Sequence, residues 1–544
     1  MGSQNILATP PTPSAILDPL LERVRAFNTQ PPVGLCQFNL DAEMPLLLNP
    51  PDEPVPCSEP LALFEAVNAH FSAQIHAFFH ALHSLEQLAV NEPDLIRPTS
   101  GLQPEIQITN QSYDIYPDCL HRLHPSRRLT VQNADTLPLL HRVTQLRVHP
   151  ETNYHCEPGL DSAHQRPLSP RVPFQLAARL PNLRALHCRW LWERLPVAFW
   201  SRALRVFARV WEGPWRDARA EFARGVRDFV PVMPAGLAKV RLWFWKPIWG
   251  TEMDEAVRMP DLVMGASSNA EEFGGVDPVS CGLRELGGWL EELDVRALVT
   301  PDLFPCSGGG GGGDGSEAGD AASSSWPRMR HLKVEFHPCA PTGSWYFSGP
   351  RGEDPFPTGF AVTKEDHYPP GREDIEETHD LWWRDEDEWD DMGKDENIFQ
   401  PRRPDMFRIR PIQERVNPLL LAFASSLGRE TMPSLQDAEL FTWLTWLPSE
   451  ERRKEYEGGV GAPGASWVPQ VDGDCQVMFR WGVKYEAPKG DEKGKVTWQV
   501  GESWMPGTEI MRAFEHLLGE DRDNVEWQSF DFVEDRDSYM ADYD

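Results

Sequence analysis

A short apolar pattern, Φ-P-x-Φ-x-x-Φ-x-Φ with Φ a hydrophobic residue, recurs along the chain and limits the folds that it can adopt. The clear copies run from Leu180 to Cys188, from Trp326 to Val334 and from Met432 to Leu440. In each copy the proline ends a preceding helix, and the alternating Φ-x-Φ predicts a strand. Such a unit cannot bury its own hydrophobic face, so neighbouring units must stack. The pattern predicts a solenoid, which is a scaffold for binding, and it indicates no reaction.

Looser copies precede and follow the first clear copy. They run through Val143, Leu146 and Val148, through Met233, Pro234, Val240 and Leu242, and through Leu290, Leu293 and Val295. The third hydrophobic residue of each copy falls at Leu146, Leu186, Val240, Leu293, Leu332 and Ala438, so the copies are 40, 54, 53, 39 and 106 residues apart. Regular leucine-rich repeats are about 20–29 residues long. We therefore expect an α/β fold, an irregular leucine-rich-repeat-like solenoid of helix–strand repeats with a parallel sheet and long disordered or loop inserts.

Composition and patterning divide the chain into four segments. They are a Pro-rich, partly ordered N-terminal segment (1–60), an N-terminal helical cap with its connection (61–128), the leucine-rich-repeat-like region (129–447) with flexible inserts at 307–325 and 353–396, and a C-terminal part (448–544) with a β-hairpin, a helix and an acidic tail. The apolar stripe from Phe71 to Ala89 predicts a helix over Leu61 to Val90. Thr508 to Leu518 is typical of a closing amphipathic helix.

The net charge of −31 is unevenly distributed along the chain. Gly371 to Glu396 contains 13 acidic and 3 basic residues, and Gly519 to Asp544 contains 10 acidic and 2 basic residues. Between Arg171 and Lys246, by contrast, 15 basic residues accompany 5 acidic ones and several tryptophans. Seven of these arginines fall at helical spacing: Arg202, Arg205, Arg209, Arg216, Arg219, Arg224 and Arg227.

Arginines interleaved with tryptophans can bind single-stranded nucleic acid by pairing with phosphates and stacking on bases. In the alternative interpretation, arginine stems cover a tryptophan-rich core while their charged heads meet solvent or the chain's own acidic segments. The overall negative charge repels polyanions, so we expect no nucleic-acid partner.

The cysteines and the absence of long apolar stretches indicate the compartment. The nine cysteines form no CxxC pair, which favours reduced thiols in a cytoplasmic or nuclear protein. The first residues lack the basic and apolar regions of a signal peptide, and no stretch approaches the ~18 apolar residues of a membrane span. We expect a soluble intracellular protein without a membrane partner.

Several clusters resemble metal sites but lack the required spacing. His76, His80 and His83 share one side of a helix with His70 nearby, yet no Glu follows His76 as a metalloprotease motif requires. A second loose cluster contains His149, His155 and Cys156, with Cys119 and His121 upstream, and it matches no zinc module. In the acidic run Asp385 to Asp391, Trp389 occupies a place where a calcium loop needs an oxygen ligand.

Motifs of catalysis are also missing from the sequence. There is no GxSxG, no kinase signature, and no Gly-Lys-Ser/Thr after the glycine run that begins at Gly308. We therefore nominate no catalytic, cofactor-binding or metal-binding residue, and we expect no cofactor.

Three features carry a resemblance to a known class of proteins. They are the Leu-Pro-x-Leu-x-x-Leu copies, His337-Pro338 followed by Gly343 to Pro350, and Trp481 to Tyr485 followed by Val496-Thr497-Trp498. With these the chain resembles uncharacterised filamentous-fungal proteins of F-box-type, leucine-rich-repeat-like architecture, over roughly residues 130–520. The resemblance implies a repeat face that holds a protein partner and an N-terminal F-box that joins a ubiquitin-ligase adaptor. Where an F-box would begin, Ala15 to Phe27 supplies only Ile16-Leu17-Asp18-Pro19-Leu20-Leu21.

These observations favour a non-enzymatic protein–protein interaction scaffold of unknown partner. A degenerate F-box-type substrate receptor is a special form of this hypothesis. The alternative is an enzyme whose site is assembled from loops without a linear motif.

Overall fold

The computed structural model of the chain describes residues 10–29, 36–42, 61–92, 101–108, 127–150, 166–189, 191, 193, 211–245, 254–263, 272–305, 325–368, 405–457, 477–489, 493–501, 504–519, 524–528 and 532–533. These residues form a mixed α/β protein in which most strand pairs are parallel. They divide into two compact units. Unit 1 contains the described residues up to 221 with 228–237 and 367–368, and unit 2 contains 222–227, 238–366 and 405–533.

The strands of unit 1 are all parallel and follow one another in chain order. They are β1 (Cys36–Ala42), β2 (Leu102–Ile108), β3 (Gln145–Pro150) and β4 (Ala185–Cys188). β1 and β2 extend this sheet beyond the predicted repeat region, which begins at Leu129. In β2, Leu102, Ile106 and Ile108 are buried, which anchors the strand to the core.

Helices cap the start of unit 1. α2 (Leu61–Asn91) confirms the predicted helix, and its apolar stripe through Phe71, Ile75 and Phe78 is fully buried. α1 (Pro13–Thr29) packs on α2 and buries Leu20 and Val24. Two further helices precede strands, as the helix–strand pattern predicts: α4 (Val172–Ala177), and α6 (Glu212–Phe229), whose residues contribute to both units.

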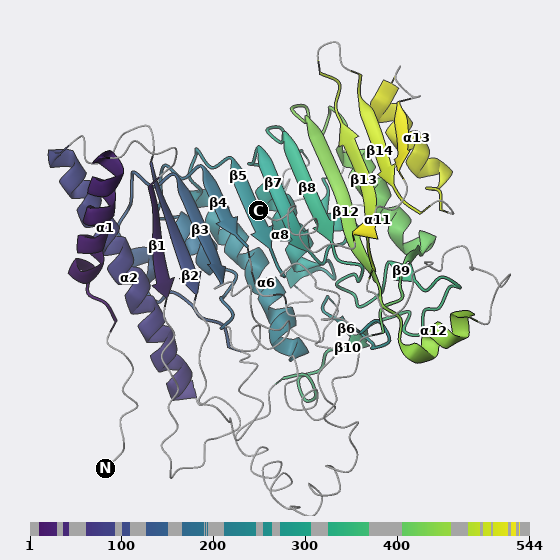
Figure 1. Cartoon of the computed structure of the whole chain (residues 1–544), viewed down its shortest axis with the longest axis horizontal. Coiled ribbons are helices and arrows are strands. Elements are labelled where there is room, and N and C mark those ends of the chain that lie inside the picture. The colour runs from purple at the N-terminus through teal and green to yellow at the C-terminus, as the bar shows by residue number, and fades with distance from the viewer. Residues whose placement is uncertain are drawn as a thin grey trace, which may run out of the picture. The chain divides into compact units, whose positions relative to one another are not determined.

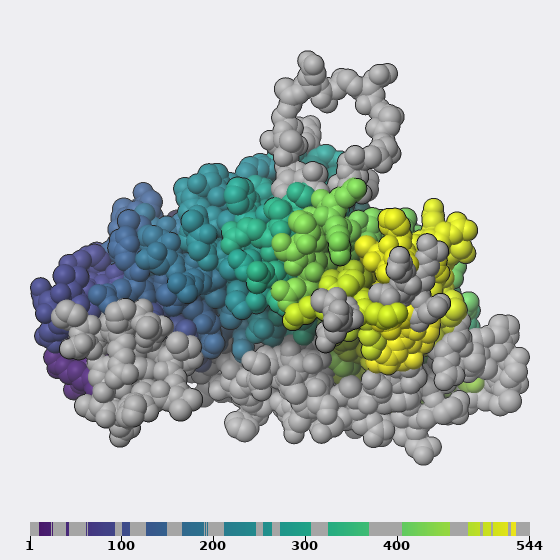
Figure 2. Space-filling view, turned by 90° about the horizontal axis from the view of Figure 1, so that it is seen from above, coloured from purple at the N-terminus to yellow at the C-terminus, as the bar shows by residue number. Residues whose placement is uncertain are grey.

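The main strands of unit 2 also lie side by side in chain order. They are β5 (Lys239–Trp243), β7 (Glu292–Ala297), β8 (His331–Phe336), β12 (Asp437–Trp446), β13 (Val477–Glu486), β14 (Lys495–Gln499) and β15 (Val525–Gln528), and β16 (Phe532–Val533) pairs with β13. Figure 1 shows this succession, and the space-filling view of Figure 2 shows the same order from teal through green to yellow. Sequential neighbours that pair directly are the simplest way to build a sheet from repeated units.

The recurring pattern places equivalent residues side by side. In unit 1 Leu146 pairs with Leu186, and in unit 2 Val240, Leu293, Leu332 and Ala438 follow one another across four parallel strands. Each of these six residues is at most 2% exposed. The sequence therefore predicts both the strands and their register, because the third hydrophobic residue of each copy enters the same buried layer.

Five of the six copies also form the same turn before the strand. The amide of the second hydrophobic residue donates to the carbonyl three residues earlier: Leu183 to Leu180, Leu237 to Pro234, Leu290 to Gly287, Met329 to Trp326 and Leu435 to Met432. The next residue then donates to its equivalent in the preceding copy: Arg184 to Thr144, Glu291 to Ala238, Arg330 to Glu291 and Gln436 to Arg330. Successive copies thus share one turn geometry and one connecting hydrogen bond.

Helices pack against the buried side of the unit 2 strands. α8 (Pro278–Gly287) begins at Asp277, whose carboxylate accepts from the Ser280 amide at 2.8 Å, a helix N-cap. α11 (Gln413–Ser426) precedes β12, and α13 (Thr508–Leu518) has the predicted bounds. β13 and β14 form the predicted antiparallel hairpin, and α12 (Glu450–Glu457) follows β12.

The segment between β8 and β12 adds no further copy, because β12 pairs directly with β8. Its described residues instead form the short strands β9 (Phe347–Ser348), β10 (Phe360–Ala361) and β11 (Arg410–Pro411), and β10 pairs with β6 (Pro260–Asp261) while β11 pairs with β9. The start of the predicted insert 353–396, up to Tyr368, is built into these elements. The rest of that insert, and nearly all of the insert 307–325, lie outside the described residues.

Candidate functional site

The unit 2 strands present a second side that is polar. Alternate residues of a strand point to opposite sides of a sheet. The hydrophobic repeat residues are buried on one side of the sheet, and α8 and α11 lie behind the strands in Figure 1. We call the other side the open face. Its first row is Lys239, Glu292, His331, Asp437, Glu486 and Lys495, its second row is Arg241, Asp294, Lys333, Glu439, Lys484 and Thr497, and its third row is Trp243, Arg296, Glu335, Phe441, Gly482 and Gln499.

Charges alternate in sign along the second row of the open face, from Arg241 to Lys484. Ion pairs join neighbouring strands in these rows: Lys239 to Glu292 at 2.6 Å, Arg241 to Asp294 at 2.8 Å, and His331 to Asp437 at 2.6 Å. The side chains of these pairs are between 22% and 54% exposed to solvent. Opposite charges that face each other across strands favour this register. The rows leave a patterned polar surface in contact with solvent.

The third row of the open face is buried and aromatic. Arg296 pairs with Glu335 at 3.0 Å, and its guanidinium carbon lies 4.3 Å from the centre of the Trp243 ring. Phe441, Trp443 and Met478 complete an apolar cluster with Trp243. The open face therefore changes from half-exposed ion pairs, where the parallel strands begin, to a buried aromatic group where they end.

Gly482 allows β12 and β13 to approach each other beside Phe441. It is the register partner of Phe441, and a Cβ atom there would lie 2.4 Å from the Leu440 carbonyl oxygen. Across the Phe441 ring, the guanidinium carbon of Arg480 lies 3.9 Å from the ring centre. Arg480 also pairs with Glu439. The glycine thus makes room for an aromatic residue that carries cations on the open face.

Lys333 differs from the other basic residues of the open face. Lys239, Arg241, Arg296, His331, Arg480, Lys484 and Lys495 each lie within ion-pair distance of a carboxylate. In the described part of the chain, the Lys333 ammonium has none, and its contact is the Phe441 ring, whose centre lies 5.4 Å away. Lys333 is half-buried and lies in the middle of the second row.

The corresponding side of the unit 1 sheet contains a smaller charged group. Glu105 on β2 accepts a hydrogen bond of 2.5 Å from His149, and Arg147 lies 3.8 Å away. The hydrogen bond with His149, followed by the charges of nearby basic groups, lowers the pKa of Glu105. His149 belongs to the loose His/Cys cluster that matches no zinc module, and here it engages the Glu105 carboxylate. Glutamines accompany Glu105 on this side of β2, as Gln103 and Gln107.

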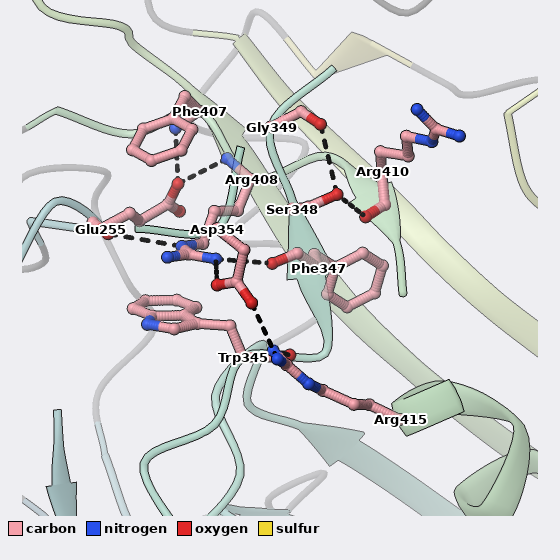
Figure 3. A network of polar contacts seen from close by, with 10 residues as sticks. All are labelled: Glu255, Trp345, Phe347, Ser348, Gly349, Asp354, Phe407, Arg408, Arg410 and Arg415. Carbon is pink, nitrogen blue, oxygen red and sulfur yellow. Dashed lines mark hydrogen bonds and ion pairs between the residues drawn. The ribbon is translucent and has the colours of Figure 1, made fainter. Parts of the chain in front are cut away.

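A buried polar cluster holds the irregular segments of unit 2 together (Figure 3). Asp354 bridges two arginines, with Arg408 at 2.7 Å and Arg415 at 2.8 Å. Arg408 is fully buried and donates further to the carbonyls of Phe347 and Glu255. We call Glu255, Asp354, Arg408 and Arg415, with the backbone groups that they bind, the clasp. It joins the turn after β5 to β9, to β11 and to the start of α11.

The Glu255 carboxylate lies inside the clasp. It accepts the amides of Phe407 and Arg408, both at 2.5 Å. Burial raises the pKa of Glu255 to about 7, although these amides and the Arg408 charge act in the opposite direction. The carboxyl group therefore changes its ionisation near neutral pH. Because Glu255 is 3% exposed and Arg408 0% exposed, these groups are closed to a substrate.

An aromatic group adjoins the clasp. His337 lies edge-on to Trp245, with ring centres 5.1 Å apart, and Trp345 stacks beneath the Arg408 guanidinium. Burial lowers the pKa of His337 to about 3, so its imidazole is neutral. Burial also raises the pKa of the Cys339 thiol. These titratable groups are uncharged core residues, which is the opposite of an activated catalytic group.

The predicted histidine cluster on α2 is spread along the helix. His70 is buried, the His76 ring is 2.9 Å from the Gln132 carbonyl oxygen, and His80 is exposed. The His83 ring is half-buried. Among the described residues, no group of three or more His, Cys, Asp or Glu side chains is arranged to hold a metal ion.

Several described arginines of the basic region pair with carboxylates of the chain. Arg219 pairs with the buried Glu193, and Arg224 and Arg227 both pair with Glu272. Arg216 donates to the Tyr368 hydroxyl, which itself donates to Asp217. These contacts fit the alternative to nucleic-acid binding, in which arginine stems cover the core and their charged heads meet the chain's own acidic groups.

Several predicted candidates lie outside the described residues. They are Cys119, His121, His155, Cys156, Arg202, Arg205, Arg209 and the acidic run 385–391.

Comparison with protein-family models, with curated proteins and with solved structures finds no significant match. Among the described helices, none combines the length and apolarity that crossing a bilayer requires. Functional inference for this chain therefore rests on its own geometry.

Proposed function

We propose that the chain is a non-enzymatic binding protein, an irregular leucine-rich-repeat-like solenoid whose open face holds a protein partner. The observation that carries this proposal is the second row of the open face. There, five side chains from Arg241 to Lys484 alternate in sign across five strands and stay accessible to solvent. A rigid sheet that fixes charges in a set pattern supplies specificity, because a partner with the wrong pattern meets like charges.

The repeated turn and the repeated hydrogen bond between copies support the solenoid part of this proposal. In a solenoid each unit contacts its neighbours through equivalent groups. The bonds from Glu291 to Ala238, from Arg330 to Glu291 and from Gln436 to Arg330 repeat at one position of the pattern. This periodicity persists although the intervals between copies are unequal.

The clasp favours a binding protein over an enzyme. It is a buried group of titratable side chains in unit 2, and its carboxylates accept hydrogen bonds from arginines and backbone amides. A catalytic group must instead reach its substrate within hydrogen-bond distance. The clasp has the properties of a structural support for the segments that it joins.

Charge reversal on the open face tests the proposed function. We expect the double variant K239E/D437K to lose a stoichiometric partner that the wild-type chain captures from its native cell extract. The variant R328E is the matched control, because Arg328 is 42% exposed but precedes β8 and lies outside the three rows. Equal capture by the wild-type chain and both variants would contradict the open face as the binding surface.

A further inference from the structure

Among the described residues, the open face contains one cation, Lys333, with no carboxylate within ion-pair distance. Lys333 lies between Asp294 and Glu439 in the second row. Both carboxylates are engaged elsewhere, since Asp294 pairs with Arg241 and accepts from the Trp243 indole at 3.1 Å, and Glu439 pairs with Arg480. The Lys333 ammonium therefore stands over the Phe441 ring without a carboxylate partner.

Among the described residues, the charge balance around Lys333 is positive by one. The other cations in and beside the second and third rows each pair with a carboxylate: Arg241 with Asp294, Arg296 with Glu335, Arg480 with Glu439 and Lys484 with Glu486. These eight charges cancel, and the Lys333 charge remains. This surplus is notable because the whole chain has a net charge of −31. A partner that supplies one negative charge would neutralise this surplus.

We propose that Lys333 anchors a single carboxylate of a polypeptide partner, an isolated Asp or Glu side chain whose neighbours are neutral or basic. This inference rests on the proposed function and adds the chemistry of the partner. Neighbouring strands of the sheet are about 4.8 Å apart, so Asp294 and Glu439 lie close to Lys333 on both sides. A second acidic residue of the partner, beside the first, would approach one of these carboxylates and be repelled. A run of acidic residues is thus rejected, and an isolated one is accepted.

The Phe441 ring holds the ammonium in place for this contact. A lysine above an aromatic face is attracted by the ring quadrupole, which restricts its flexible stem. Phe441 is itself buried, and Gly482 fixes its position against β13. The Lys333 side chain is therefore already restricted, and it loses less conformational entropy when a carboxylate binds.

Selection from a random library of short linear peptides displayed on phage, with the immobilised full chain as bait, tests this proposal. We expect the enriched peptides to carry one acidic residue without an acidic neighbour. As synthetic peptides they should bind K333Q at least about tenfold more weakly than the wild-type chain, which is the loss of one charge-assisted hydrogen bond. Selection on K333E should enrich a basic residue at the same place.

K454Q is the matched control, because Lys454 lies on α12, outside the three rows of the open face, and already pairs with Glu450 at 2.6 Å. We expect it to change peptide affinity by no more than about twofold. Loss of binding to K239E/D437K would show that a peptide needs the open face. If such peptides bind K333Q and the wild-type chain equally, the Lys333 anchor is overturned and the proposed function stays intact. Enrichment of acidic runs would also overturn it. Peptides that bind K239E/D437K as well as the wild-type chain would instead count against the proposed function itself.

Discussion

The open face and the clasp both contain ion pairs, but the two regions use them differently. In the first row of the open face the pairs join neighbouring strands and keep much of their solvent exposure, as with Lys239 at 54%. In the clasp, Arg408 is 0% exposed and its partner Asp354 is 16% exposed. Exposed pairs contribute about 0–1 kcal/mol, whereas removal of one partner of a buried pair costs about 3–5 kcal/mol.

This difference teaches where stability and recognition reside in unit 2. The clasp joins segments that are far apart in the sequence. Because its charges are buried, removal of one charge leaves its partner buried without a compensating charge. The open face contributes little to stability, and its charges are free to be selected for a partner. Four substitutions test this division, from the largest expected effect to the smallest.

Arg408→Met should have the largest effect. It leaves Asp354 and Glu255 without the Arg408 charge inside the clasp, and we expect the free energy of unfolding to fall by about 3–5 kcal/mol. Urea denaturation followed by tryptophan fluorescence measures it. Arg410→Met is the control, because the Arg410 side chain donates only a long bond of 3.4 Å to the Pro350 carbonyl. Equal losses for the two variants would mean that the clasp is not the stabilising element.

Glu255→Gln should change how stability depends on pH. Since burial raises the pKa of Glu255 to about 7, the folded chain keeps a proton that the unfolded chain has already lost. Between pH ~4.5 and pH ~7 the wild-type free energy of unfolding should fall, by up to about 3 kcal/mol, as the pH rises. The variant lacks this component but keeps an oxygen acceptor for the Phe407 amide. A difference between the two proteins that stays constant over this range would contradict the account.

Gly482→Ala should test the support beneath the open face. The added Cβ would lie 2.4 Å from the Leu440 carbonyl oxygen, so β12 and β13 would have to separate. We expect a loss of about 1–3 kcal/mol in thermal or chemical denaturation. At Gly428 the nearest atom to such a Cβ is 4.0 Å away, and Gly428→Ala should be neutral or slightly stabilising. A neutral Gly482→Ala would show that the strands have room to adjust.

Lys239→Met should have the smallest effect on stability. Its pair with Glu292 is exposed, and we expect a change below about 1 kcal/mol in the same denaturation assay. A loss as large as that of Arg408→Met would remove the distinction between the two regions.

The repeat pattern made much of the fold predictable. It located the buried strand residues, such as Leu293 and Leu332, and their alignment followed because each occupies the same place in its copy. The helix at Leu61 and the hairpin with its closing helix were predictable from periodicity alone. β1 and β2 lacked the pattern, so they escaped prediction.

The candidate site was not predictable in the same way. Lys333 and Glu439 are polar positions between hydrophobic ones, and nothing local distinguishes them from ordinary solvent-facing residues. Their relation exists only once β8 and β12, 106 residues apart in the pattern, are paired in register. The clasp is still less accessible to sequence reasoning, since Glu255, Asp354 and Arg408 come from three separate irregular segments.

Site-specific photocrosslinking tests the central claim, that the open face is the binding surface, most directly. A benzophenone side chain would replace His331, which is 41% exposed in the first row, and in a second variant Trp289, which is 48% exposed in the turn before β7. The account predicts one discrete adduct from position 331 in native extract, lost in the background of K239E/D437K, and none from position 289. Crosslinking from position 289 but not from position 331 would contradict it.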